Sequence, residues 1–144
     1  MKLILAALLV LLTTLPLSAA DIVLRTWRMR PSGVAGDKSH QVQTITQVGD
    51  GVKVDVEVDI GNGTKMSMTY TTKLDGAEVP VYSSGKVVMT FRAKRTGPNT
   101  YEGSTTANGT TTNFKTTVSA DGKVMTSEST TGSIKSRSVY DRVN

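Results

Sequence analysis

Met66 and Met68 are the residue pair in this sequence best suited to holding a metal ion. In an extended chain their side chains share one face about 7 Å apart, because alternate residues of a strand point the same way. Thioether sulfur selects soft ions such as Cu(I), so the pair would suit a periplasmic copper- or silver-binding protein. Methionine also fills irregular gaps in apolar cores. We favour core packing for both residues and expect neither a metal nor another cofactor.

The sequence offers little for catalysis. It contains no cysteine and one histidine, His40, which lies in polar surroundings just before a predicted strand. Nucleophilic catalysis needs a serine or cysteine beside a base, and a single solvated histidine gives it no support. Asp55, Glu57 and Asp59 alternate along one segment, as on the exposed side of an amphipathic strand. We predict that the protein is not an enzyme and has no catalytic residues.

The segment 51–60 indicates the fold class. β-Branched residues occupy every second position from Val52 to Ile60, and charged residues fill the positions between them. Successive side chains of a strand point to opposite faces, whereas a helix would scatter these valines around its axis. The pattern therefore predicts a strand with one apolar and one polar face. Extended to its neighbours, it predicts an inward face of Val52, Val54, Val56, Val58, Met66, Met68, Tyr70, Met89, Phe91 and Phe114, with Lys53, Asp55, Glu57 and Lys73 facing water.

Further segments of this kind alternate with short turns. Gly49-Asp50-Gly51 and Asn108-Gly109 are hairpin signals, and Pro80 indicates an edge strand or a bend. The expected strands are 22–30, 41–48, 52–60, 64–74, 79–81, 86–95, 100–106, 110–119, 123–131 and 138–143. They predict an all-β fold, an antiparallel up-and-down β-barrel of about eight to ten short strands with little or no helix. Closure would remove exposed sheet edges, and an immunoglobulin-like sandwich is the alternative.

The first residues have the composition of a secretory leader. Lys2 precedes an apolar stretch, and Ser18-Ala19-Ala20 supplies small residues for a signal peptidase. We expect residues 1–20 to be removed before Asp21, which leaves 21–144 as a single barrel domain. An uncleaved anchor is the alternative, but the apolar stretch is shorter than the ~20 residues of a spanning helix. The lack of cysteine suits a bacterial periplasm or culture medium, so we expect a periplasmic or secreted protein.

The basic residues do not gather into a binding surface. The formal net charge is +5 at pH 7, and its basic residues are dispersed rather than interleaved with stacking aromatics. Arg92-Ala93-Lys94-Arg95 is the one cluster, and it fits the solvated face of a strand that leads into a turn. We expect no nucleic-acid partner, no membrane span once the leader is removed, and a monomer.

Hairpin motifs follow one another through most of residues 21–144. They are Thr26-Trp27-Arg28 and the stretches 48–54, 70–76, 79–81, 99–103, 118–123 and 139–142. Their content and order resemble a family of small exported bacterial proteins with a lipocalin-like β-barrel and no established activity. The resemblance implies one small barrel whose ligand, if any, is unknown.

A more distant similarity is to the lipocalins. Their pattern has Gly-x-Trp on the first strand and an arginine near the carboxyl end that packs over the tryptophan. Trp27 and Arg142 are similar to these two residues, whereas Arg25 stands in place of the glycine. For Trp27 we favour a packing role, as a plug that closes the barrel floor.

Two functions fit such a barrel. It is either a binding module for a small apolar molecule, or a structural or protein-interaction barrel with a filled core. Small residues dominate the expected inward face, which favours a hollow interior and therefore the binding module. Tyr70, Thr72 and Thr116 would supply hydroxyls that orient a guest. The full set of expected interior ligand-binding residues is Trp27, Met66, Met68, Tyr70, Thr72, Met89, Phe91, Phe114 and Thr116.

Overall fold

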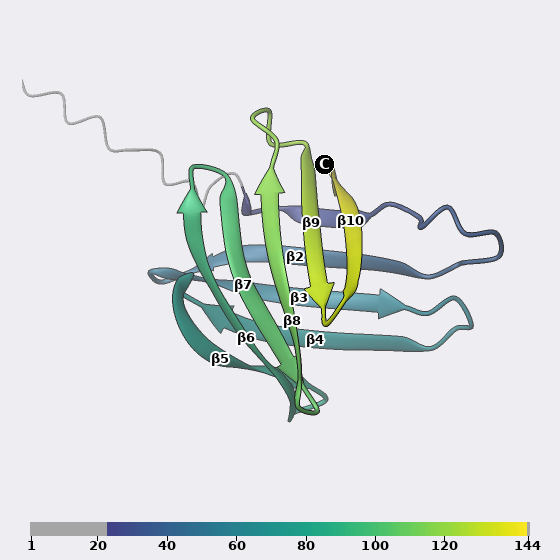
Figure 1. Cartoon of the computed structure of the whole chain (residues 1–144), viewed down its shortest axis with the longest axis horizontal. Helices are drawn as coiled ribbons and strands as arrows, with labels where there is room; N and C mark the ends of the chain where they lie inside the picture. The colour runs from purple at the N-terminus through teal and green to yellow at the C-terminus, as the bar shows by residue number, and fades with distance from the viewer. Residues whose placement is uncertain (1–22, 144) are drawn as a thin grey trace, which may run out of the picture.

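A computed structural model describes residues 23–143, whose regular elements are ten strands (Figure 1). They are β1 (Thr26–Met29), β2 (His40–Val48), β3 (Gly51–Asp59), β4 (Lys65–Thr72), β5 (Asp75–Ser83), β6 (Lys86–Gly97), β7 (Thr100–Ala107), β8 (Thr110–Val118), β9 (Val124–Thr131) and β10 (Ile134–Val143). Each strand pairs with its sequence neighbours, and β1 pairs with β10 to close the barrel. The predicted antiparallel up-and-down barrel is confirmed.

The expected leader, residues 1–20, and its cleavage site lie outside the described residues. The description begins at Val23, which is 6% exposed and already part of the core. Within residues 23–143 the structure contains no helix with the length and apolar character of a membrane span.

The barrel is built as two crossing layers. Strands β1–β4 run across the view of Figure 1, β6–β10 run upright in front of them, and the curved β5 lies at the lower left between the two sets. Most neighbouring strands share several residue pairs, but between β4 and β5 the described register contains the single pair Thr69 and Tyr82. Pro80 lies on β5 and pairs with Thr90 of β6. A proline is tolerated there because β5 is almost an edge strand on its β4 side.

Three strands begin four residues away from the sequence-based expectation, and the first of them, β1, begins at Thr26 rather than at residue 22. Strand β5 begins at Asp75, where a turn was predicted, because the reversal occurs one residue earlier at Leu74, whose φ is 56°. The register then shifts between Asp75 and Glu78, so the strand continues past an irregularity. Strand β10 begins at Ile134 rather than at residue 138. Its first four residues do not alternate in polarity, and backbone pairing with β9 holds them in the sheet.

The alternation of β3 gives the barrel its inner and outer faces. Val54 is 4% exposed and lies between Ile45 of β2 and Tyr70 of β4, while Lys53 and Glu57 are exposed. A shift of one residue would exchange the two faces, so these contacts fix the register. Of the other predicted inward residues, Val52 and Val56 are buried, and Val58, Met68, Tyr70, Met89, Phe91 and Phe114 are half-buried.

One end of the barrel is packed with side chains. Trp27 is fully buried there, and its indole Nε1 donates a hydrogen bond to the Val23 carbonyl at 3.0 Å. It belongs to one apolar cluster with Val118 and Met125. Arg142 of β10 lies directly opposite Trp27 in the register between β1 and β10. The buried Nε of Arg142 has no hydrogen-bond partner among the described residues.

The opposite end of the barrel is open. Met66, Val87 and Ile134 share the inward faces of β4, β6 and β10, but their exposed fractions are 46%, 57% and 71%. Inward-facing side chains are therefore covered at one end of the barrel and reach solvent at the other.

The outer face of β5–β10 carries a ladder of alternating charge. Each member lies directly opposite the next on the neighbouring strand, and Lys115 Nζ lies 3.6 Å from Glu102 Oε1. Opposite charges that face one another across strands support the register. The charge ladder comprises Asp75, Lys94, Glu102, Lys115, Glu128 and Arg137.

Two hairpins use turns with positive φ at both central residues. Asn108 and Gly109 have φ values of 51° and 74°, so the predicted type I′ turn is confirmed. Ser84 and Gly85 adopt the same geometry, with φ values of 50° and 75°, at a turn that the sequence analysis did not single out. Such turns match the twist of the strands they join.

Replacing Val118 with aspartate tests the packed end. The side chain is 2% exposed and does not border the cavity described below, so a carboxylate would lose water without gaining a partner. We expect the free energy of unfolding in urea to fall by about 3 kcal/mol or more. Val88→Asp, on the outer face of β6, is the control and should change it by less than ~0.5 kcal/mol. Equal effects would show that the faces are wrongly assigned.

Candidate functional site

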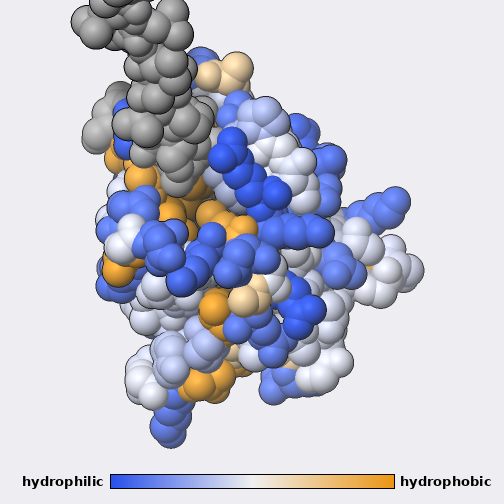
Figure 2. Space-filling view, turned by 90° about the vertical axis from the view of Figure 1, so that its left-hand side faces the viewer, coloured by the Kyte–Doolittle hydropathy of each residue, from blue (hydrophilic) through white to orange (hydrophobic). Residues whose placement is uncertain are grey.

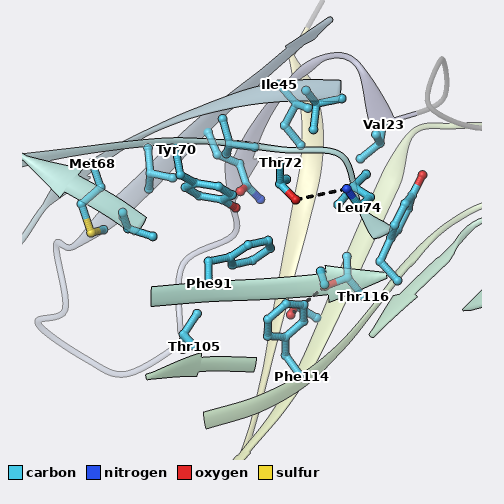
Figure 3. A pocket seen from close by; sticks show the side chains of 18 of the residues that line it. Val23, Ile45, Met68, Tyr70, Thr72, Leu74, Phe91, Thr105, Phe114 and Thr116 are labelled. Carbon is cyan, nitrogen blue, oxygen red and sulfur yellow. Dashed lines mark hydrogen bonds between the residues drawn. The ribbon is translucent and has the colours of Figure 1, made fainter. Parts of the chain in front are cut away.

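The barrel encloses a cavity of ≈ 250 Å³ that is partly open to solvent (Figure 3). Strands from both layers line it, so it is an interior space rather than a surface groove. Its wall is mainly apolar, which is typical of sites for small molecules. The side of the barrel shown in Figure 2 is mostly hydrophilic, with hydrophobic side chains visible in recesses between the polar ones. Its lining includes Gln41, Gln43, Met68, Tyr70, Thr72, Met89, Phe91, Ala93, Tyr101, Thr105, Phe114, Thr116, Ser127 and Tyr140.

Three aromatic rings follow one another across the cavity. The ring centroids of Tyr70 and Phe91 lie 4.4 Å apart, and those of Phe91 and Phe114 lie 5.5 Å apart with nearly parallel planes. Tyr70 comes from β4, whereas Phe91 and Phe114 come from β6 and β8, so the rings join the two layers (Figure 3). Aromatic pairs at these separations attract one another beyond the area that they bury.

A glycine lets two strands approach closely beside these rings. Gly103 of β7 lies between Ala93 of β6 and Phe114 of β8 in the register. A Cβ atom on Gly103 would lie 1.9 Å from the Arg92 carbonyl oxygen, so no larger residue fits without moving the backbone. The backbones of β6 and β7 therefore approach closely at Gly103. The neighbouring ring of Phe114 lines the cavity.

The polar groups of the wall are neutral. Gln41 Nε2 donates to the Tyr140 hydroxyl at 3.3 Å, and the Thr116 hydroxyl donates to Ser127 Oγ at 3.1 Å. The Thr72 hydroxyl accepts a hydrogen bond from the backbone N–H of Leu74 at 3.1 Å. These groups are hydrogen-bonded in the empty barrel and can also offer unused donor or acceptor capacity to a guest.

Burial keeps the cavity tyrosines protonated. It raises the pKa of Tyr70 well above the ordinary value, and nearby Tyr140 raises it further. Burial also raises the pKa of Tyr140 and of Tyr101. At neutral pH the hydroxyls of these residues are therefore uncharged groups that both donate and accept hydrogen bonds.

Most of the residues expected to bind a ligand border the cavity. Met68, Tyr70, Thr72, Met89, Phe91, Phe114 and Thr116 all line its wall. Two other expected residues do not line it. Trp27 fills the packed end of the barrel, and Met66 lies at the solvent-exposed end of β4. Alternation predicts the face on which a residue lies, but its depth depends on where the strand crosses the barrel.

The sequence analysis missed several residues of the wall. Gln41 and Gln43 are polar, but they share the inward face of β2 with Ile45. Tyr101 and Tyr140 line the cavity from β7 and β10. Alternation with apolar neighbours was the available signal for all of them, because residues two apart on a strand share a face.

The structure does not bring the two methionines together as a metal site. Met68 borders the cavity, whereas Met66 is 46% exposed beyond it. Residues 23–143 contain no group of three or more His, Cys, Asp or Glu side chains arranged to hold a metal ion. Met68 therefore fits the core-packing interpretation, in which methionine adapts to an irregular wall.

Comparison with known proteins identifies the fold. No family model and no curated protein matches the sequence. Among solved structures, the barrel is similar to a Schistosoma mansoni fatty acid binding protein in complex with arachidonic acid, with a TM-score of 0.65 and 17% identity over 88% of this chain and 99% of that one. It is also similar to Echinococcus granulosus fatty-acid-binding protein 1, with a TM-score of 0.64 and 12% identity over 86% and 99% of the two chains.

Wild-type fluorescent protein UnaG shares the fold as well. Its TM-score is 0.62, with 15% identity over 86% of this chain and 99% of that chain. At these identities the likeness concerns the fold alone. The chain has the architecture of the lipocalin-like and fatty-acid-binding β-barrels.

The buried hydroxyl of Tyr70 predicts a loss of stability in alkali. Unfolding returns its pKa to about 10, so above that pH the unfolded chain releases a proton that the folded chain retains. The free energy of unfolding should therefore fall as pH rises above about 10. Tyr70→Phe keeps the ring and should show a smaller fall in urea titrations between pH 9 and 11. An equal pH dependence in the variant and the wild type would contradict the buried placement of this hydroxyl.

Proposed function

We propose that this protein is an exported, monomeric, non-enzymatic barrel that binds one small apolar molecule in its interior. The observation that carries the proposal is the ≈ 250 Å³ cavity with its mainly apolar wall. Protein interiors are close-packed and contain few voids larger than a water molecule. A cavity of this size inside a closed barrel is therefore unusual, and it supports the binding of a molecule there.

The cavity volume limits the size of the occupant. An engineered apolar cavity of about 150 Å³ stays dry and binds benzene. By proportion, a cavity of ≈ 250 Å³ accommodates a body of about ten non-hydrogen atoms. A longer chain would extend through the open end of the barrel, where Met66, Val87 and Ile134 offer apolar surface.

The shared fold supports binding but not a particular ligand. The Schistosoma mansoni protein with this architecture was solved with arachidonic acid, and the Echinococcus granulosus protein is named for fatty-acid binding. Both are binding proteins by name rather than enzymes. With identities of 17% and 12%, they support an apolar guest as a class and leave its headgroup to be argued from this chain's own residues.

The alternatives are less well supported. A structural or protein-interaction barrel would have a filled core, as at the end that holds Trp27, but the middle of this barrel is hollow. A copper- or silver-binding role would use Met66 and Met68, whose side chains occupy different environments.

Placing a phenylalanine on the cavity wall tests the proposed binding. Thr105 faces the cavity, while Thr106 faces outward and its hydroxyl lies 3.0 Å from that of Thr111. Thr105→Phe should raise the dissociation constant for 1-naphthol, a neutral two-ring fluorophore, about tenfold or more by filling part of the space. Thr106→Phe adds the same ring outside and should leave it unchanged. Equal dissociation constants in both variants, with native circular dichroism, would contradict binding in the cavity.

Export is tested on the protein recovered from the periplasm or the medium. The composition of residues 1–20 motivates a leader that is removed before Asp21. Amino-terminal sequencing should therefore begin at Asp21. Retention of Met1 in membrane-associated protein would support the uncleaved anchor instead.

A further inference from the structure

No charged side chain lines the cavity among the described residues. None of the described residues that line it is an Asp, Glu, Lys, Arg or His. Most charged residues of the surrounding strands lie on the outer face, as in the charge ladder of β5–β10, whereas Arg95 and Arg142 lie on the inward face outside the cavity lining. A guest in the cavity therefore meets hydroxyl and amide groups but no fixed charge.

Two arginines near the cavity are not placed to neutralise an acidic guest. Arg142 faces the packed end opposite Trp27, and neither of these residues borders the cavity. Arg95 acts electrostatically on Tyr101, but its guanidinium is exposed and donates to two turn carbonyls, those of Gly97 and Pro98, each at 2.9 Å. Neither cation lines the cavity, so an anion held there would have no cation among the residues that surround it.

Neutral hydrogen-bonding groups are available where the cations are not. Gln41 and Tyr140 form one hydrogen-bonded pair on the wall, and Tyr140 lies near enough to Tyr70 to raise the pKa of the Tyr70 hydroxyl. The Tyr70 hydroxyl and the Gln43 amide form no hydrogen bond with another residue among 23–143. These groups can donate to a carbonyl oxygen or accept from a hydroxyl.

The energetic consequence depends on the charge of the guest. A carboxylate moved from water to this wall loses its hydration and finds no cation, which is costly in an apolar site. A hydroxyl or carbonyl of the same molecule loses less hydration and recovers hydrogen bonds from the tyrosine and glutamine groups. The same hydrocarbon body should therefore bind far more tightly in its uncharged form.

We propose that the cavity selects uncharged guests, apolar bodies of about ten non-hydrogen atoms with one hydroxyl or carbonyl group, and rejects the corresponding carboxylates. This inference rests on the proposed function, since it concerns the guest of the same cavity. It separates this barrel from neighbours of similar fold whose names refer to fatty acids.

The test compares guests that differ in their headgroup. Binding of 1-octanol, methyl octanoate and sodium octanoate to the exported protein is measured by isothermal titration calorimetry at neutral pH. These molecules share one hydrocarbon chain, and only octanoate is charged. We expect octanol and the ester to bind, and octanoate to bind about tenfold more weakly or worse.

Introduced charge provides the second arm of the test. Gln43→Lys places a cation on the cavity wall and should reduce the discrimination against octanoate about tenfold. Gln47→Lys adds the same charge at the exposed end of the same strand and should leave the discrimination unchanged. Arg142→Gln should also leave it unchanged, because Arg142 does not border the cavity.

The outcomes separate the two proposals. Octanoate binding as tightly as octanol would overturn the selection of uncharged guests while supporting binding in the barrel. Loss of octanoate binding in Arg142→Gln would overturn it too, by identifying a cation that reaches the guest. Failure of all three compounds to bind would overturn both this inference and the proposed function. If Gln43→Lys does not fold, the comparison of headgroups on the wild-type protein decides alone.

Discussion

The barrel depends on the contact between its two layers at the place where backbone pairing is weakest. Strands β4 and β5 share one residue pair, Thr69 and Tyr82, so side chains must hold the layers together there. The rings of Tyr70, Phe91 and Phe114 do so from the inside, at centroid separations of 4.4 and 5.5 Å. The rings also set the distance between the two layers. The contact that joins the layers therefore bounds the cavity as well.

The packing around this contact is uneven along the barrel axis. At one end Trp27 fills the interior and is anchored by its hydrogen bond to Val23. Beside the rings, Ala93 lines the cavity and is too small to fill the space that the crossing strands enclose. A uniformly large inward face would have removed the cavity, and a uniformly small one would have left the barrel without a core. The inward face of this barrel combines large and small residues, so the barrel has both a core and a cavity.

The charged side chains of β5–β10 lie mainly on the outer face of the barrel. The outer face carries the alternating charge ladder of β5–β10, which supports the register at little desolvation cost because its members remain in water. The polar groups that line the cavity are all neutral, and burial keeps hydroxyls such as that of Tyr70 protonated by raising their pKa. The wall can therefore orient a guest by hydrogen bonds without the penalty of an unpaired buried charge.

The sequence by itself determined the fold class, because alternation and turn chemistry are local. Val54 alternates with Lys53 and Asp55 whatever the strand pairs with, and Asn108-Gly109 forms its type I′ turn from its own backbone preference. Only the tertiary structure decided how far along the barrel each inward residue lies. For that reason Trp27 and Met66 do not line the cavity, whereas Gln43 and Tyr140 do. The tertiary structure also decided that β5 and β10 extend beyond their apolar patterns, because backbone pairing with the neighbouring strands keeps the additional residues extended. The cavity belongs to the same category, because a void is the volume that remains after residues distant in sequence have packed against one another.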